Sequence, residues 1–377
     1  MADAGQERAG RPSLLSAQGW PYLLIPFIPL AIVLELADAS AGLIFAVAAL
    51  GIIPTAALMG LATEELAARS GPGIGGLLNV TFGNAPELII ALFALGAGLH
   101  EVVKASIAGS IIGNILLVLG ASMFVGGVRR DRQRFDATAA NVQSLMLFLA
   151  AAALIMPAIF ELVEGKGLPS PGAELVNYDT EVEKLSVAVA VVLIVTYVAG
   201  LYFSLRTHRD LFNPDEEGDE EAAFGWSVRR SVVMLAIAGI AVGAMSEILV
   251  GSISEASESI GLSEFFIGVI VVAIVGNAAE HWVAVLVAHK NKMNLAVNIA
   301  IGSSAQVALF VAPVLVFASF LLGPEPMALV FNGFELGAVV LAVLIANYVT
   351  HEGESTWFEG VQLLAVYVIL GLAFFFA

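Results

Sequence analysis

The segment GNAPE at residues 83–87 recurs as GNAAE at residues 276–280, and this pair of segments decides the fold. The offset from Gly83 to Gly276 is 193 residues. Each segment lies inside a long apolar stretch of the chain. Two near-identical segments at a fixed offset indicate an internal repeat.

Around these segments the composition is that of a membrane protein. Of 377 residues, 59% are hydrophobic and 13% are charged, about half the charged share of a soluble domain. The formal net charge of −17, from 16 Lys and Arg against 33 Asp and Glu, argues against nucleic acid as a partner. The absence of cysteine excludes disulfides and zinc–thiolate sites.

Eleven membrane spans are predicted, because a transmembrane helix needs roughly 20 mostly apolar residues. The first apolar stretch is interpreted as a helix and not as a signal peptide, since no small-residue cleavage site follows it. The fold class is therefore an all-α polytopic membrane protein. The approximate limits of the spans are 20–37, 40–66, 73–99, 101–126, 138–162, 183–205, 229–252, 263–289, 293–321, 327–348 and 357–376.

The basic residues predict the orientation, because cytoplasmic loops are enriched in Lys and Arg. With eleven spans, 13 of the 16 basic residues fall on one side, and the other side receives Lys104, Lys166 and Lys184. The N-terminus is thus predicted in the cytoplasm and the C-terminus outside. The short N-terminus favours a bacterial plasma membrane.

The repeat unit is predicted to be five spans, because the motifs fall in spans 3 and 8. Five is odd, so the two halves cross the membrane in opposite directions. The predicted regions are 1–39 (N-terminus and extra helix), 40–205 (first repeat), 206–228 (acidic linker) and 229–377 (inverted repeat). Inverted repeats are typical of secondary transporters, whose substrate binds near the midplane.

Glu87 and Glu280 lie in the middle of their spans, where an ionised carboxylate is costly and marks a functional site. Glycine, and Pro86 in the first motif, disfavour helix just before each glutamate, so both spans are predicted to be discontinuous there. An oxygen site with two negative charges suits a hard divalent cation, above all Ca²⁺. The predicted ligand set is Glu87, Glu280, Asn84, Asn277, Gly83 and Gly276. The alternative for each glutamate is a neutral acid hydrogen-bonded between helices.

Further polar residues surround the motifs. Asn114 follows Glu87 by 27 residues and Gln306 follows Glu280 by 26. The residues predicted to support the site or form a proton path are His281, Asn114, Gln306, Ser110, Ser303 and Glu247. The alternatives are interhelical hydrogen bonding for the amides and ordinary packing for the serines and His281. Glu64 and Glu65 are interpreted as charges at a helix end.

An acidic segment lies between the halves. One interpretation is a solvated linker, and the other is a regulatory segment that attracts or senses cations on the cytoplasmic face. Its acidic residues are Asp215, Glu216, Glu217, Asp219, Glu220 and Glu221.

The two motifs, with THRDLF at 207–212 and GSSAQ at 302–306, resemble the cation/proton exchanger (CAX) family of Ca²⁺/H⁺ antiporters over nearly the whole chain. The resemblance implies Ca²⁺ transport driven by a proton gradient, with Glu87 and Glu280 as the shared Ca²⁺ and H⁺ site. It implies no cofactor, since Ca²⁺ is the transported substrate. Na⁺/Ca²⁺ exchangers of the same superfamily are the alternative, but they carry hydroxyl residues where this chain has Asn84 and Asn277.

The coupling follows from charge. One Ca²⁺ or two protons neutralise the two carboxylates, and the empty, doubly charged site is costly, so the carrier crosses only when loaded. The predicted partners are Ca²⁺, H⁺ and the lipid bilayer, without nucleic acid, and a homo-oligomer is allowed. A cation channel and an intramembrane enzyme are further alternatives. The enzyme is disfavoured because no Gly-x-Gly-Asp motif occurs.

Overall fold

The computed structural model describes residues 19–70, 72–172, 180–208 and 225–377, which are mostly helical. One 3₁₀ segment (η1), four π-helical segments (η2–η5) and two short strands accompany the α-helices. In chain order the elements are η1 (Trp20–Leu24), α1 (Phe27–Leu36), α2 (Ala41–Ser70), α3 (Pro72–Gly83), α4 (Ala85–Gly96), α5 (His100–Ile112), η2 (Gly113–Val118), α6 (Leu119–Gly127), β1 (Gln133–Arg134), α7 (Ala137–Val163), α8 (Thr180–Tyr202), η3 (Phe203–Thr207), α10 (Val228–Ile260), α11 (Glu264–Phe266), η4 (Ile267–Val272), α12 (Ala273–His289), α13 (Met293–Gln306), η5 (Val307–Val311), α14 (Ala312–Ser319), α15 (Gly333–Thr350), β2 (Glu354–Ser355) and α16 (Trp357–Phe375).

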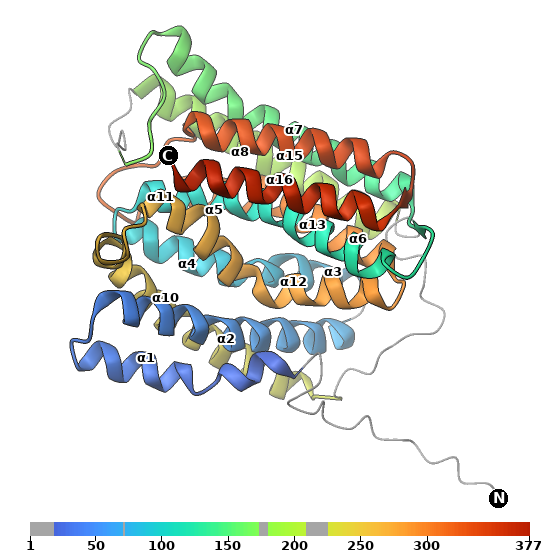
Figure 1. The fold of residues 1–377 in the computed structure, drawn as a ribbon, viewed down its shortest axis with the longest axis horizontal. Coiled ribbons are helices and arrows are strands. Elements are labelled where there is room, and N and C mark those ends of the chain that lie inside the picture. The colour runs from blue at the N-terminus through green and yellow to red at the C-terminus, as the bar shows by residue number, and fades with distance from the viewer. Residues whose placement is uncertain (1–18, 71, 173–179, 209–224) are drawn as a thin grey trace, which may run out of the picture.

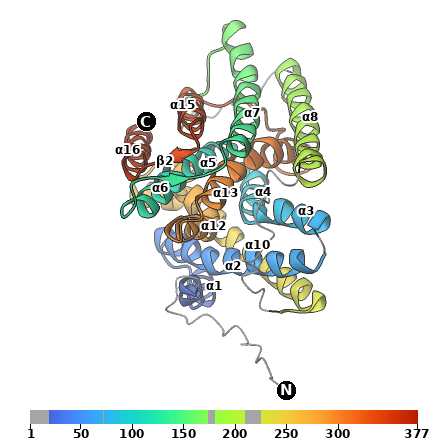
Figure 2. The same ribbon diagram turned by 90° about the vertical axis from the view of Figure 1, so that its right-hand side faces the viewer.

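The helices form layers that both views show (Figures 1 and 2). Helices α1, α2 and α10 lie on one side of the molecule, and α7, α8, α15 and α16 lie on the other. Between them lie α3, α4, α5, α6, α12 and α13. The two motif segments therefore lie in the middle of the molecule.

Among the described residues, nine helices are long and apolar enough to cross a membrane. They correspond to nine of the eleven predicted spans. A tenth span is counted if α3 and α4, bent by 42°, form one broken span. The remaining predicted span is the shorter apolar helix Trp20–Leu36. The membrane class is confirmed, and the count of eleven stays a prediction.

Two predicted boundaries differ most from the structure. Span 7 was expected to end at residue 252, but α10 continues to Ile260. Span 10 was expected from residue 327, but residues 327–332 are not helical and α15 begins at Gly333. Side chains replace the missing helical hydrogen bonds: the Ser319 hydroxyl accepts from Met327 N at 2.8 Å and the Ser186 hydroxyl from Leu329 N at 3.0 Å. Such buried backbone needs these partners, because apolar surroundings offer none.

Helices α2 and α10 pack antiparallel against each other. A Cβ at Gly42 of α2 would lie 3.2 Å from Ser259 Oγ of α10, and one at Gly51 would lie 2.9 Å from Met245 Sδ. As the residue number rises along α2, it falls along α10. Small residues permit this close approach of helices in a membrane.

The closest helix contact predicts a strong effect on stability. A Cβ at Gly109 of α5 would overlap the carbonyl oxygen of Val269 in η4. Gly109→Ala is therefore expected to destabilise the fold, since overpacking costs about 1–3 kcal/mol and backbone cannot rotate away. The measurement is the melting temperature of the detergent-solubilised protein. Gly60→Ala is the control, because a Cβ there meets nothing within 4 Å, and equal melting temperatures for the two variants would contradict the expectation.

Loops from the two halves meet at one end of the molecule. Strands β1 and β2 pair antiparallel, with Gln133 opposite Ser355. Glu354 accepts hydrogen bonds from Arg132 at 2.7 Å and Arg134 at 3.1 Å, and the Arg132 guanidinium holds the pKa of Glu354 below its usual range. Arg130 donates to the carbonyl oxygens of Gly126 and His289. We call this end, marked by residues 129–134 and 289–292, the basic end.

Candidate functional site

The first motif interrupts its membrane span, as predicted. Helix α3 ends at Gly83, α4 begins at Ala85, and Asn84 between them has φ −94° and ψ 17°. Pro86 lies in the first turn of α4, where its missing N–H costs nothing. Glu87 is in the same first turn, where the positive end of the helix dipole favours a negative charge.

The second motif does not interrupt its span, so that prediction is wrong. Helix α12 runs from Ala273 to His289 through the whole of residues 276–280. The physical reason is Ala279 in the place of Pro86, because alanine keeps its backbone N–H and favours helix. The irregular backbone occurs earlier, in the π-helical segment η4, and such π segments are frequent at functional sites.

The two motifs cross each other with glutamate against glycine. A Cβ at Gly83 would lie 3.2 Å from Glu280 Oε1, and a Cβ at Gly276 would lie 3.2 Å from Glu87 Cγ. Residues 83 to 87 thus run past residues 280 to 276 in the opposite direction. Each glycine leaves room for the carboxylate side chain of the other motif, and the two carboxylates are close enough to interact electrostatically.

The neighbouring amides form contacts between the halves. Asn84 Nδ2 donates to Gln306 Oε1 at 2.6 Å, and Asn277 Nδ2 donates to Ser110 Oγ at 3.1 Å. The Ser303 hydroxyl donates to Glu280 Oε2 at 3.1 Å. In both asparagines the amide nitrogen donates to another protein group, so the amide oxygen is left to accept from or coordinate another partner.

Several buried oxygens at the crossing have no hydrogen-bond partner among the described residues. They are both carboxylate oxygens of Glu87 and the Oδ1 atoms of Asn84 and Asn277. An unsatisfied buried polar group costs about 1–3 kcal/mol, so the site is suited to a proton, a water molecule or a cation. Within the described part of the chain no three His, Cys, Asp or Glu residues cluster as a metal centre. The oxygen donors at the crossing of the two motifs are two carboxylates and the amide oxygens.

The other predicted residues do not all lie at the crossing of the motifs. His281 Nε2 lies 2.9 Å from Asn114 Oδ1, so this pair adjoins the crossing. Glu247 is exposed on α10. The six acidic linker residues between Asp215 and Glu221 lie outside the described residues.

Sequence reasoning missed the role of Glu65. Glu65 is not an ordinary charge at a helix end, because it is 1% exposed and its Oε2 accepts from the backbone N–H of Trp226 at 2.8 Å. Glu64 is exposed on α2. The signal available in the sequence was only the pair of acidic residues inside an apolar span.

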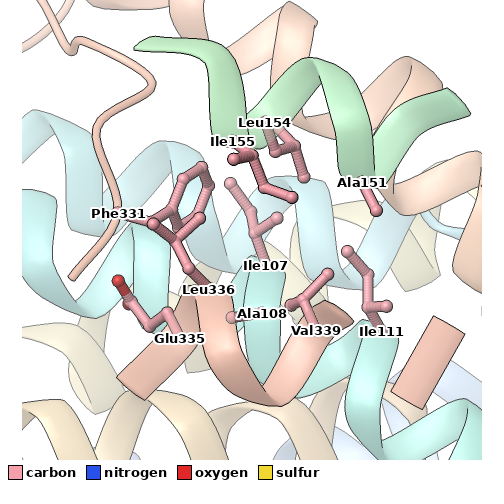
Figure 3. Close-up of a pocket in the computed structure, with 10 residues that line it drawn as sticks. All are labelled: Ile107, Ala108, Ile111, Ala151, Leu154, Ile155, Phe331, Glu335, Leu336 and Val339. Carbon is pink, nitrogen blue, oxygen red and sulfur yellow. The ribbon is translucent and has the colours of Figure 1, made fainter. Parts of the chain in front are cut away.

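A hollow between α5, α7 and α15 is not part of this site (Figure 3). Its lining is apolar except for Glu335. The Glu335 carboxylate serves the N-terminus of α15, where its Oε2 accepts from Asn332 N at 2.8 Å. The hollow therefore lacks the several oxygen donors that a cation needs.

The crossed motifs with their buried carboxylates, inside a bundle of membrane helices, define the class of protein as a membrane ion transporter. The chain belongs to the sodium/calcium exchanger protein family, whose model matches residues 40–206 and 230–376. It is 45% identical over 372 residues to a Ca²⁺/H⁺ antiporter of Synechocystis, covering 94% of this chain and 96% of that protein. It is 46% identical over 351 residues to the Ca²⁺/H⁺ antiporter ChaA of Bacillus subtilis, covering 92% and 96% of the two chains. The solved structure of native YfkE matches with a TM-score of 0.80 and 41% identity, covering 95% of this chain and all of that one.

Proposed function

We propose that this protein is a secondary transporter that exchanges Ca²⁺ for H⁺ across a membrane. The observation that carries the proposal is the crossing of the two motifs. It buries two carboxylates beside amide oxygens that lack partners among the described residues. Homologues named as Ca²⁺/H⁺ antiporters support the choice of ions.

The proposed site consists of Glu87 and Glu280 with the oxygens of Asn84 and Asn277. Ca²⁺ takes six to eight oxygen ligands at about 2.3–2.6 Å, so water and backbone carbonyls beside Gly83 and Gly276 complete the shell. Ser303, Gln306, Ser110, Asn114 and His281 hold these ligands in place. In the return step two protons occupy the same carboxylates, and access alternates between the two sides of the membrane.

We further propose eleven spans arranged as an extra helix and two inverted five-helix repeats, with regions 1–39, 40–205, 206–228 and 229–377. The antiparallel packing of α2 on α10 supports this layout. So do the two matches of one family model, one in each half. The N-terminus and the basic end are placed in the cytoplasm and the C-terminus outside, in a bacterial plasma membrane. The acidic segment 215–221 is proposed to attract or sense cations there.

The alternative is a Na⁺/Ca²⁺ exchanger, and the experiment is ⁴⁵Ca²⁺ uptake into proteoliposomes. Vesicles with an acidic interior, diluted into alkaline medium, are expected to accumulate Ca²⁺ as protons leave. The uptake is expected to vanish when an ionophore collapses the pH gradient. An outward Na⁺ gradient, at equal ionic strength inside and outside and without a pH gradient, is expected to drive no Ca²⁺ uptake.

Two results would contradict the proposal. Uptake that follows the Na⁺ gradient and ignores the pH gradient would identify the Na⁺/Ca²⁺ exchanger. Passive Ca²⁺ flux without counter-transport of either ion would identify a channel.

A further inference from the structure

Helix α13 carries a polar stripe from the basic end to the crossing of the motifs. Its residues are spaced by four, which places them along one face of the helix. Three of them are polar, Asn294, Asn298 and Gln306, and the fourth is Gly302. Gln306 accepts from Asn84, and Ser303 beside the stripe donates to Glu280. The rest of α13 is largely apolar and buried, so the stripe stands out from its surroundings.

The stripe begins at a small polar hollow at the basic end. Asp136, Asn294 and Asn298 contribute to its lining, and it has room for a water molecule. The backbone N–H of Asp136 donates to Asn294 Oδ1 at 2.5 Å. The Asp136 carboxylate caps α7 by accepting from Thr138 N and Ala139 N. Hydrogen bonds therefore fix the positions of the polar groups beside this hollow.

Gln143 of α7 continues the polar line at mid-depth. Its Nε2 donates to Asn298 Oδ1 at 2.7 Å. A Cβ at Gly302 would lie 3.4 Å from the same nitrogen, so the glycine gives the amide its room. Gln143 Oε1 is buried and has no hydrogen-bond partner in the described ranges. A bridging water is the expected partner, because an unsatisfied buried oxygen costs about 1–3 kcal/mol.

The corresponding positions of the other half do not form such a line. They lie 192 residues earlier and are Val102, Ser106 and Ser110 on α5 and Asn114 in η2. Val102 is apolar and 1% exposed, and Ser106 donates to the carbonyl of Val103 in its own helix. The hollow beside α5 is lined by Ile107, Ile111 and Val339 (Figure 3). The polar line is therefore confined to the basic end.

We propose that the line Asn294–Asn298–Gln143–Ser303 holds a file of water molecules that carries protons, but not Ca²⁺, between the basic end and Glu280. The inference rests on the proposed function and adds a separate route for one of its two ions. Ca²⁺ is excluded because it needs six to eight oxygen ligands, whereas the amide oxygens of Asn294 and Asn298 already accept hydrogen bonds from the protein. Along the file each step breaks an O–H bond in one water and forms one in the next. The last step gives the proton to the Glu280 carboxylate, and nothing is oxidised or reduced.

The test compares two transport modes of the reconstituted full-length protein. Uptake of ⁴⁵Ca²⁺ driven by a pH gradient requires proton transfer, whereas exchange of ⁴⁵Ca²⁺ outside for unlabelled Ca²⁺ inside does not. Gln143→Leu is expected to slow the first mode about tenfold or more and to leave the second within about twofold. Asn298→Leu blocks the same line from α13 and is expected to behave alike.

Two controls separate this role from packing. Gln143→Glu keeps a polar side chain of the same size and is expected to restore proton-driven uptake. Ser144→Ala removes the neighbouring buried hydroxyl, which lies 3.1 Å from Thr350 Oγ1, and is expected to leave both modes unchanged. An equal fall of both modes in Gln143→Leu and Asn298→Leu, or no change in either mode, would overturn the water file. Wild-type protein without proton-driven uptake would instead refute the proposed function itself.

Discussion

Glu87→Gln or Glu280→Gln is expected to reduce Ca²⁺ uptake driven by a pH gradient to the background of empty vesicles. Each glutamate lies against the glycine of the opposite motif, so glutamine fits the same space. The amide removes one of the negative charges that pair with the bound Ca²⁺, and the loss of one partner of a buried charge pair costs roughly 2–5 kcal/mol of binding free energy. That is about thirtyfold or more in affinity. Glutamine also cannot take up the proton that the return step requires.

The measurement is initial ⁴⁵Ca²⁺ uptake at equal amounts of reconstituted protein. Glu181→Gln is the matched control, because Glu181 is an exposed carboxylate that pairs only with Lys184 on its own helix among the described residues. It is expected to transport like the wild type. Near-normal proton-driven uptake by either motif variant would show that this carboxylate is not part of the exchange site.

The candidate site could be proposed from the sequence because its signals are local. Pro86 removes a backbone donor at one place, and the helix is interrupted there. Glutamates in apolar spans need a partner or a function wherever the spans pack. These arguments need no knowledge of the tertiary structure, and they led directly to Glu87 and Glu280.

Other features depend on contacts that the sequence does not display. Ala279 stands where the first motif has Pro86, and α12 is continuous through its motif, because a glycine without a proline lowers helix propensity by only about 1 kcal/mol. Residues 327–332 are apolar enough for a helix, but hydroxyls from Ser319 and Ser186 satisfy an extended backbone instead. Glu65 meets Trp226 across 161 residues of chain, a contact that no local pattern announces.

The pH dependence of Ca²⁺ binding is the second large expected effect. If Ca²⁺ and protons compete for Glu87 and Glu280, the apparent Ca²⁺ affinity must fall as the pH falls. Where both carboxylates are protonated in the absence of Ca²⁺, each bound Ca²⁺ releases about two protons, so linkage gives a fall of about a hundredfold per pH unit. The dependence flattens at higher pH, where the free site is already ionised. The pair titrates as a unit, so the curve belongs to both glutamates together.

The measurement is Ca²⁺ binding to the purified protein across pH, with and without Na⁺ at constant ionic strength. A single motif variant that still binds is expected to show a limiting fall of about tenfold per pH unit, because only about one proton is then displaced. Constant ionic strength keeps general screening equal in all samples, because screening also weakens charge interactions as salt rises. A Na⁺-coupled exchanger would show competition by Na⁺ of at least equal size. Affinity that fell with Na⁺ and ignored pH would therefore exclude protons as the competing ion and assign the two carboxylates to Na⁺/Ca²⁺ exchange.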